Sequence, residues 1–324
     1  MALRIFVDVA APPDTMQQLR DVAAGHQLLF PLKPAVSVLH KADSDPQLFT
    51  ADIAFGQPDP KAVANADTLK WIHVSSSSIT RYDNPSFRAR VAERGIVVTN
   101  SATVYAEACA EHVLAFMLAQ SRQLPVGLKT RVAGGTEAWQ TLRGNSVPLR
   151  GQTVLILGYG AIGKRLTELL RRFEMRIIAY RRTARGDEGV PVVTEAQLAP
   201  TLAHEADHIV NILPDSAATY HFFDASRFAA VKPGAVFYNI GRGTTVDQDV
   251  LLFALRSGRL KAAWLDVTDP EPLPDDHPLF AESNCFITPH VAGGHLDESS
   301  TLVRHFGANL NRFVRGEPLL DRVM

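Results

Sequence analysis

The stretch "TVLILGYGAIG", which begins at Thr153, constrains the fold of this chain more than any other feature of the sequence. A near-continuous apolar strand leads into glycines 158, 160 and 163, in G-x-G-x-x-G spacing, and then into the helical pattern "KRLTELLRRF". A strand this apolar is typical of a parallel sheet covered on both faces. Gly158 permits the tight turn, Gly160 lets the backbone approach a pyrophosphate, and Gly163 lets the helix pack closely on the sheet.

This glycine loop predicts a dinucleotide site. A bare G-x-G-x-x-G pattern is more often only a tight turn, but here a strand precedes it, a helix follows, and a second strand lies beyond. The start of the helix offers free N–H groups and the positive end of its dipole to phosphates. The residues of the loop expected to contact the cofactor are Gly158, Tyr159, Gly160, Ala161, Ile162 and Gly163.

The next predicted strand, residues 176–180, ends in Arg181 and Arg182, with Arg185 close by. An acid in this place, about 20 residues beyond the first glycine, would hydrogen-bond the adenine ribose 2′-hydroxyl of NAD. A guanidinium would instead bind a 2′-phosphate through charge-assisted, often bidentate, hydrogen bonds. The alternative is a solvated basic turn. The sequence therefore predicts a preference for NADP(H), with NAD(H) possible.

Composition narrows the class of protein. The chain has 324 residues, enough for two domains, and a net charge of −1 with 33 basic against 34 acidic residues. This balance gives no electrostatic reason to expect nucleic acid or an anionic membrane as a partner. Cys109 and Cys285 fit no metal-ligand spacing and suggest two reduced thiols in a cytoplasmic protein without a metal site. We see no signal peptide and no run of about 18 apolar residues that would span a membrane.

An alternation of strands and helices runs along most of the chain and predicts an α/β fold. A helix is expected at residues 14–24, with Asp14 as its N-cap, a long one at 104–123, and a last one at 299–314. Residues 132–145 look like a connection. The strands are expected at residues 4–9, 52–55, 69–74, 96–99, 153–158, 176–180, 208–212, 235–240, 262–266 and 285–288.

Three segments that carry reactive side chains each follow a predicted strand. In a doubly wound sheet, ligands bind at these carboxyl ends of the strands. Arg242 stands between two glycines in "NIGRGTTVD", Glu271 between two prolines in "LDVTDPEPLP", and His290 follows an apolar strand in "ITPHVAGG". Flanking glycines bring backbone close to a ligand, and a guanidinium there could clamp a carboxylate. Taken singly, each residue is more often structural: a surface arginine, a solvated carboxylate or a packed histidine.

The order of GYGAIG, NIGRGTTVD, DVTDPEPLP and TPHVAGG resembles the D-isomer-specific 2-hydroxyacid dehydrogenase family over nearly the whole chain. The resemblance implies an α/β fold of two Rossmann-like or flavodoxin-like domains, each a doubly wound parallel sheet, with the active site in the cleft between them. Residues 1–102 with 296–324 would form the substrate domain, and residues 103–295 the dinucleotide-binding Rossmann domain.

The resemblance also implies a role for each reactive residue. Arg242 would bind the substrate carboxylate, His290 would be the general acid and base, and Glu271 its partner. Backbone amides of the serine run Ser76, Ser77 and Ser78 would cradle the carboxylate. Further cofactor contacts would come from Leu213, Pro214, Ile240, Gly241, Asp266, His290 and Gly293.

The segment "DVTDPEPLPDDHPLF" is similar to the glyoxylate/hydroxypyruvate reductase branch, which implies NADPH-dependent reduction of a small 2-oxo acid. The chain departs from the family pattern at Arg181, Thr80 and His295, and the last two leave the substrate open. The helix at 104–123 matches the segment through which the family forms homodimers. Trp139 either reaches a neighbouring subunit's active site or packs at an interface or in the core.

Other functions stay open. The substrate could be another 2-oxo acid, such as pyruvate, phenylpyruvate or a relative of 3-phosphoglycerate. Formate dehydrogenase shares the fold but gives its histidine no glutamate partner, so Glu271 argues against it. A non-catalytic NAD(H)-sensing corepressor also shares the fold, and fold alone does not fix function.

Overall fold

The computed structural model describes residues 2–33 and 44–324. The chain divides into two compact units, which we call unit 1 (Met1–Tyr105 with Gly294–Met324) and unit 2 (Ala106–Gly293). The boundaries expected from the sequence, after residue 102 and before residue 296, lie within a few residues of these. Each unit is built on a parallel β-sheet, which confirms the predicted class of two parallel-sheet α/β domains.

Unit 1 has a five-stranded sheet in the order β2-β1-β3-β4-β5. All of its strand pairs are parallel. The strands β1 and β3 to β5 are almost entirely buried, as expected of strands packed on both faces. The strands are β1 (Arg4–Asp8), β2 (Gln27–Leu29), β3 (Ile53–Gly56), β4 (Trp71–Val74) and β5 (Val97–Thr99). The helices are α1 (Pro13–Val22), η1 (Pro46–Thr50), α2 (Pro60–Asn65), η2 (Thr80–Tyr82), α3 (Pro85–Glu93) and α11 (Glu298–Arg315).

Local sequence fixes where the helices of unit 1 begin. The side chains of Asp59 and Asn84 accept hydrogen bonds from the N–H groups of Ala62 and Phe87, at 2.8 and 2.9 Å, and proline opens the first turn of both helices. The prediction of Asp14 as the N-cap of α1 is wrong, because α1 follows Pro12 without a side-chain cap. Asp14 lies in the first turn, where its charge still suits the helix dipole.

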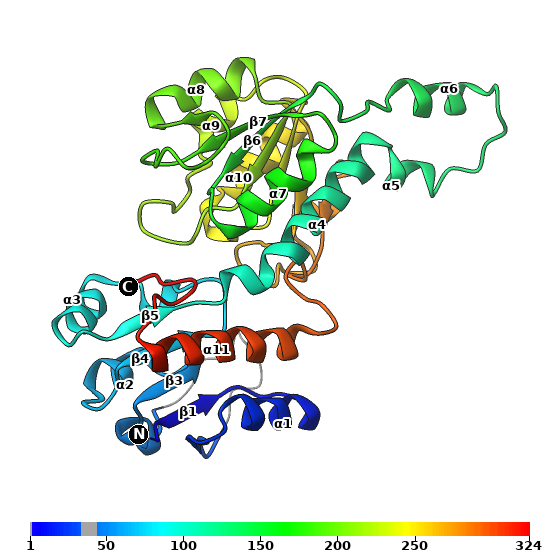
Figure 1. The fold of residues 1–324 in the computed structure, drawn as a ribbon. Coiled ribbons are helices and arrows are strands. Elements are labelled where there is room, and N and C mark those ends of the chain that lie inside the picture. The colour runs from blue at the N-terminus through cyan, green and yellow to red at the C-terminus, as the bar shows by residue number, and fades with distance from the viewer. Residues whose placement is uncertain (1, 34–43) are drawn as a thin grey trace. The chain divides into compact units, whose positions relative to one another are not determined.

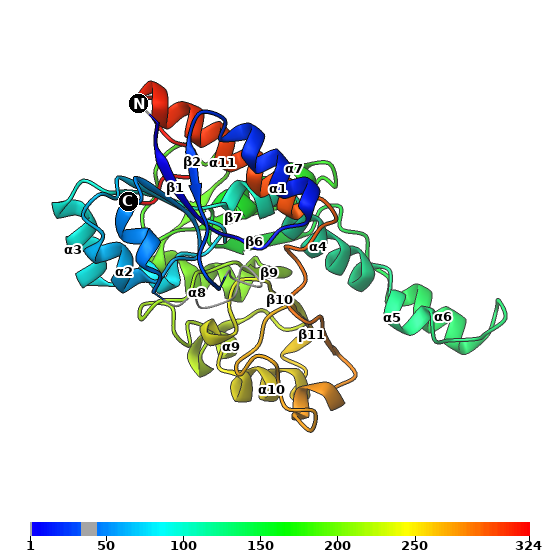
Figure 2. The ribbon, with the colours of Figure 1, turned by 90° about the horizontal axis from the view of Figure 1, so that it is seen from below.

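The last helix of the chain packs against the first. α11 and α1 lie side by side in both ribbon views (Figures 1 and 2). The contact depends on Gly307, because a Cβ atom there would lie 2.2 Å from Cγ1 of Val22. A side chain at position 307 would therefore push the two helices apart.

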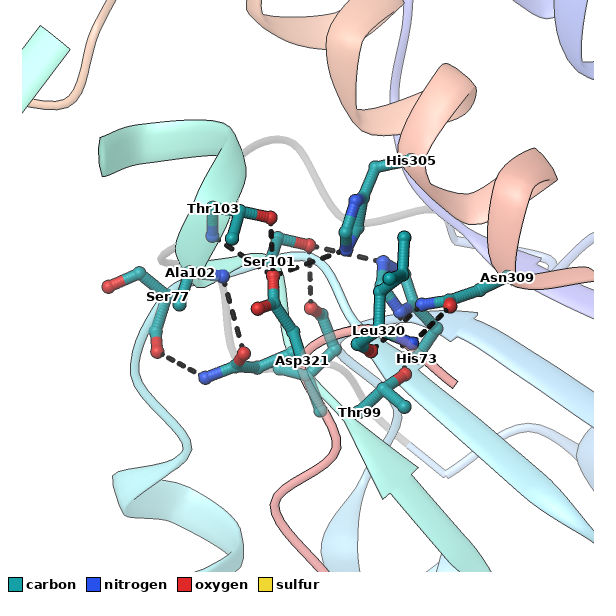
Figure 3. Close-up of polar contacts among 12 residues, drawn as sticks. His73, Ser77, Thr99, Ser101, Ala102, Thr103, His305, Asn309, Leu320 and Asp321 are labelled. Atoms are coloured by element: carbon teal, nitrogen blue, oxygen red, sulfur yellow. Dashed lines mark hydrogen bonds and ion pairs between the residues drawn. The ribbon is translucent and has the colours of Figure 1, made fainter. Parts of the chain in front are cut away.

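The C-terminal segment closes unit 1. Arg322 forms an antiparallel bridge with Thr99 beside β5, and the Val323 N–H donates to the carbonyl of Val98 at 2.9 Å. Figure 3 shows how side chains hold this segment: Asn309 of α11 exchanges two hydrogen bonds with the backbone of Leu320. Residues far apart in sequence thus complete one compact unit.

Unit 2 has a seven-stranded sheet in the order β12-β11-β10-β9-β6-β7-β8, with all pairs parallel. The strand order reverses between β6 and β9, and in such sheets ligands bind at the carboxyl ends of the strands next to this switch point. The strands are β6 (Thr153–Leu157), β7 (Arg176–Tyr180), β8 (Val192–Val193), β9 (His208–Asn211), β10 (Ala235–Asn239), β11 (Leu260–Leu265) and β12 (Cys285–Ile287).

Helices cover the sheet of unit 2 and bury a large apolar core around Leu155, Ile209 and Phe237. The helices assigned after β5 are α4 (Ala102–Ser121), α5 (Leu124–Gly127), α6 (Glu137–Gly144), α7 (Ala161–Arg171), α8 (Glu195–His204), α9 (Ala225–Ala230), η3 (Gly243–Thr245), α10 (Gln248–Arg256) and η4 (Pro278–Ala281). The predicted longer strands and helices are confirmed to within a few residues at their ends.

The expected connection at residues 132–145 contains a helix, α6, which the sequence prediction missed. α6 buries none of its residues, so it shows no apolar stripe facing a core. Together with α5 it extends away from the sheet of unit 2 in both ribbon views (Figures 1 and 2). Strands β2 and β8, of three and two residues, were also not predicted.

Helix α4 has the length to span a membrane, although Glu107, Glu111 and His112 interrupt its apolar residues. By length and composition it is apolar enough to do so, with 20 residues and a mean hydropathy of 1.2 over its best window. Its most buried side chains, Ala110, Val113 and Met117, are 0% exposed, which is equally typical of a core helix in a globular protein.

Candidate active site

The backbone that carries His290 is held in place by one buried carboxylate. His290 follows β12 and has a left-handed backbone conformation, with φ of 51°. Asp266 accepts hydrogen bonds from the N–H groups of Val291 and Ala292, at 2.9 and 2.8 Å, and from the hydroxyl of Thr288 at 2.6 Å. The His290 N–H donates to the carbonyl of Asp266 at 2.8 Å. The side chain of Asp266 is 1% exposed, so it positions the loop, a role that the sequence did not indicate.

His290 pairs with Glu271, as the resemblance implied. Its Nδ1 contacts Oε1 of Glu271 directly, and the two side chains are 26% and 38% exposed. A carboxylate on Nδ1 fixes the ring orientation and leaves Nε2 to exchange a proton with another molecule. Within residues 2–33 and 44–324, Nε2 of His290 has no hydrogen-bond partner. The pair is therefore open on the side where acid–base chemistry requires access.

Arg242 extends from the end of β10 and is mostly buried. Its Nη1 donates to the carbonyl of Gly241 at 2.6 Å. Burial lowers the pKa of Arg242 from its ordinary value, while the nearby carboxylates of Glu271 and Asp215 act in the opposite direction. The guanidinium therefore lies within electrostatic range of the carboxylate that pairs with His290.

The glycines that flank Arg242 were expected to bring backbone close to a ligand, but the structure gives them another role. A Cβ on Gly241 would lie 2.7 Å from the carbonyl oxygen of Leu213, and one on Gly243 would lie 1.9 Å from that of Thr268. Both glycines make room for neighbouring backbone of the protein itself. This close packing fixes the turn from which Arg242 projects.

The strand ends of unit 2 are joined by an asparagine network that the sequence analysis missed. Asn211 donates to Asn239 and Thr245 at 3.1 and 2.7 Å, and Asn239 donates to the carbonyl of Arg242 at 3.1 Å. The sequence contains a signal for this network, because an asparagine lies near the end of each of two predicted strands. A buried amide side chain needs hydrogen-bond partners. The predicted cofactor contacts Leu213, Pro214, Ile240 and Gly241 follow these two strands directly, and Gly293 closes unit 2.

The glycine loop has the geometry that a pyrophosphate requires. Gly158 has a φ of 93°, and a Cβ there would lie 2.6 Å from the carbonyl oxygen of Ile212. A Cβ on Gly163 would lie 2.9 Å from the carbonyl oxygen of Gly158, so α7 packs closely on the turn. Among the described residues, no atom lies within 4 Å of a Cβ built on Gly160, the N-cap of α7. The loop thus leaves open space at the start of a helix, which fits a bound dinucleotide.

The side chain of Tyr159 turns inward instead of lining this space. It is 4% exposed, and its hydroxyl donates to the carbonyl of Glu188 at 3.2 Å. Ala161 and Ile162, the first two residues of α7, are partly exposed. Only the backbone of Tyr159 is therefore suited to contact a cofactor.

The basic turn after β7 differs from a simple solvated turn. Arg182 is exposed, but Arg181 is only 15% exposed and its Nη1 lies 3.3 Å from Oε1 of Glu188, whose side chain is 3% exposed. The structure thus places a buried carboxylate next to the arginine predicted to bind a 2′-phosphate. This contact was not predicted from the sequence, because Glu188 lies seven positions further along an irregular turn.

The serine run belongs to unit 1 and follows β4. Gln57 donates to the hydroxyl of Ser76 at 2.9 Å, and Asn100 donates to the carbonyl of Ser77 at 2.7 Å. In the described part of the chain, the N–H groups of Ser76, Ser77 and Ser78 donate to no protein acceptor. A row of unpaired amides on a fixed loop is suited to bind an anion.

The two cysteines take no part in this chemistry. Cys109 is buried and Cys285 is half-buried, and both are free. Burial raises the pKa of each thiol to about 12. Both thiols are therefore protonated near neutral pH and poor nucleophiles.

Comparison with known proteins assigns the family. Residues 114–292 match the family model described as the NAD binding domain of D-isomer specific 2-hydroxyacid dehydrogenases. The chain belongs to this family. It is accordingly an oxidoreductase that uses a nicotinamide cofactor, which confirms the family and the enzyme class predicted from the four motifs.

Curated relatives extend the match to both units. The human glyoxylate reductase/hydroxypyruvate reductase is 35% identical over 230 residues, which cover 71% of this chain and 70% of the relative. The glyoxylate reductase of Aeropyrum pernix is 30% identical over 322 residues, covering 97% of this chain and 93% of the relative. A solved family member from Aeromonas salmonicida superposes with a TM-score of 0.74 at 28% identity, over 100% of this chain and 99% of that one.

Proposed function

We propose that this enzyme reduces glyoxylate and hydroxypyruvate with NADPH. The observation that carries the proposal is the partly exposed His290–Glu271 pair in the same unit as the glycine loop and the partly buried Arg242. The choice of substrate is supported by the similarity to reductases named for these two compounds. Arg181 at the end of β7 supports the choice of NADPH, since a guanidinium can bind a 2′-phosphate.

In the proposed reaction Arg242 binds the substrate carboxylate. The bound cofactor supplies a hydride to C2 of the 2-oxo acid. His290 donates the proton on Nε2 to the carbonyl oxygen as negative charge develops there, and Arg242 stabilises that charge. Glu271 holds the imidazole ring in orientation through Nδ1. In the oxidative direction, Nε2 of His290 takes the proton from the hydroxyl group.

A panel of substrates tests this proposal. NADPH oxidation is followed spectrophotometrically with glyoxylate, hydroxypyruvate, pyruvate and phenylpyruvate. We expect the highest kcat/KM with glyoxylate or hydroxypyruvate. A higher kcat/KM with phenylpyruvate would show that the enzyme acts on another substrate class. No turnover with any of the four compounds would favour a binding protein without catalytic activity.

We also propose that the enzyme forms a homodimer and that the dimer interface covers the exposed segment of residues 124–148. Leu128 and Trp139 are 84% and 36% exposed, and exposed apolar patches commonly mark protein interfaces. The other large apolar side chains exposed there are Leu124, Val126, Val132 and Val147. Sedimentation equilibrium should give a dimer for the wild type and a weakened dimer for Leu128→Glu. A monomeric wild type would contradict the proposal.

A further inference from the structure

The turn between β7 and β8 is built around the carboxylate of Glu188. Its Oε1 accepts a hydrogen bond from the Arg185 N–H at 2.8 Å, and its Oε2 accepts one from the Gly186 N–H at 2.9 Å. Gly186 has a φ of 83°, a conformation that brings neighbouring amides to one side of the chain. The hydrogen bond from Arg185 is the main reason why the pKa of Glu188 lies below its ordinary value. Glu188 is therefore a fixed negative charge at neutral pH.

The rest of the turn prevents Glu188 from moving away. The Tyr159 hydroxyl donates to the Glu188 carbonyl at 3.2 Å, and Arg171 donates to the Gly189 carbonyl at 2.8 Å. These contacts tie both sides of Glu188 to the glycine loop and to α7. Since the side chain of Glu188 is 3% exposed, it acts on a ligand through a neighbour and not by direct contact.

That neighbour is Arg181. Its Nη1 lies 3.3 Å from Oε1 of Glu188, so part of the arginine charge is already neutralised inside the protein. Arg182, by contrast, is exposed and forms no ion pair within the described residues. A 2′-phosphate that approaches Arg181 meets a guanidinium shared with a carboxylate, whereas a 2′-hydroxyl carries no charge and is insensitive to that sharing.

We propose that Glu188 is a positioning residue that acts through Arg181 and limits the preference of the enzyme for NADPH over NADH. The inference rests on the proposed role of Arg181 in binding the 2′-phosphate. Glu188 holds Arg181 in place. The charge of Glu188 lowers the affinity of the enzyme for NADPH and leaves its affinity for NADH unchanged. The enzyme accordingly uses both cofactors.

Equilibrium binding of NADPH and NADH, measured by titration of cofactor fluorescence without substrate, tests the proposal. Glu188→Gln removes the charge with little change in size, and we expect the Kd for NADPH to fall about fivefold while that for NADH stays within about twofold. Glu188→Asp keeps the charge and should keep the wild-type ratio of the two Kd values. A ratio unchanged in Glu188→Gln, or shifted equally in both variants, would overturn the proposal.

Asp187→Asn is the matched control. Asp187 neighbours Glu188 in sequence but is exposed and lies 3.5 Å from Lys164, so removing its screened charge should change neither Kd. An effect equal to that of Glu188→Gln would show that any lost acid suffices, and would contradict a specific role for Glu188.

Arg181→Ala separates this inference from the proposed cofactor preference. If Arg181 binds the 2′-phosphate, the variant weakens NADPH binding alone, and adding Glu188→Gln to it gives no tightening. Unchanged NADPH binding by Arg181→Ala would refute the proposed role of Arg181. If Arg181→Ala weakens NADPH binding but Glu188→Gln does not tighten it, only the inference about Glu188 fails.

Discussion

The His290–Glu271 pair of unit 2 and the His305–Asp321 pair of unit 1 contain the same two functional groups in different surroundings. In the first pair the side chains are 26% and 38% exposed, and in the second they are 10% and 14% exposed. Nε2 of His305 lies 3.3 Å from Oδ2 of Asp321, close to the buried ring of His73 (Figure 3). The first pair is partly exposed to solvent, and the second is enclosed by protein.

The carboxylates also differ in the number of partners. Besides its ion pair with His305, Asp321 accepts two hydrogen bonds from Thr103, one from the N–H at 3.0 Å and one from the hydroxyl at 2.6 Å (Figure 3). Burial raises the pKa of Asp321, but its contacts with His305 and Thr103 outweigh burial and leave the pKa below the ordinary value. Glu271 has the imidazole of His290 as its one hydrogen-bond partner in the described chain. A carboxylate with several donors stabilises structure, whereas one that holds a single open imidazole can support proton transfer.

The largest expected effect is on catalysis by His290→Gln. The variant loses the proton donor, so kcat for NADPH oxidation with glyoxylate should fall by about 10²–10⁴-fold. Its melting temperature should stay near that of the wild type, because the ring is partly exposed. Steady-state kinetics and thermal unfolding measure the two quantities.

His305→Gln is the matched change in unit 1 and should give the opposite pattern. We expect kcat close to wild type and a lower melting temperature, because the enclosed carboxylate loses its imidazole partner. A loss of kcat in His305→Gln as large as that in His290→Gln would remove the distinction between the two pairs.

Arg242→Lys should have the next largest effect on catalysis. One ammonium cannot replace a planar guanidinium that binds a carboxylate and stabilises developing charge, so kcat/KM should fall by about 10²–10³-fold. The Kd for NADPH, measured without substrate, should change little. A variant with wild-type kcat/KM would exclude Arg242 from the mechanism.

Asp321→Asn should lower stability and leave kcat unchanged. Losing the charged acceptor for Thr103 and the ion-pair partner of His305 should reduce the free energy of unfolding by about 1–2 kcal/mol, as measured by urea denaturation. Because the folded-state pKa of Asp321 is below its unfolded value, its contribution is present above the unfolded pKa and is lost as pH falls through the folded pKa. The difference between variant and wild type should therefore shrink in acid, and a constant difference would contradict this assignment.

His73→Gln is expected to change the pH dependence of the free energy of unfolding. Burial lowers the pKa of His73 to about 3, and its two ring nitrogens contact Thr99 and Ser101 at 2.7 and 3.2 Å. Between about pH 6.5 and 3 the unfolded chain binds a proton that the folded chain does not, so stability falls as pH falls. The variant should reduce this slope by up to about 1.4 kcal/mol per pH unit. An unchanged slope would show that His73 does not titrate in this way.

Sequence patterns predicted the sheet architecture and the residues of the first pair because both depend on local order along the chain. The apolar strand before Gly158 and the motifs around Arg242, Glu271 and His290 each follow a strand, and parallel strands bring their carboxyl ends to one edge. The same reasoning did not find the second pair, since His305 and Asp321 lie on a helix and a tail without any motif.

Other features depend on contacts that the sequence does not encode locally. Glu188 reaches Arg181 only through an irregular turn, and Asp266 holds the His290 loop from a neighbouring strand end. Helix α6 was missed because its eight residues follow Gly134 and Gly135 and end at Gly144, and glycines so placed are typical of a connection. The glycines around Arg242 were recognised, but their true neighbours, the backbones of Leu213 and Thr268, are fixed by tertiary packing.

A double-mutant cycle on His290 and Glu271 tests the central claim most directly. If the two side chains act as one unit, Glu271→Gln lowers kcat in the wild-type background but causes little further loss in His290→Gln. The coupling should appear in kcat for NADPH oxidation and not in the free energy of unfolding. Independent, multiplicative losses in kcat from the two substitutions would contradict the account.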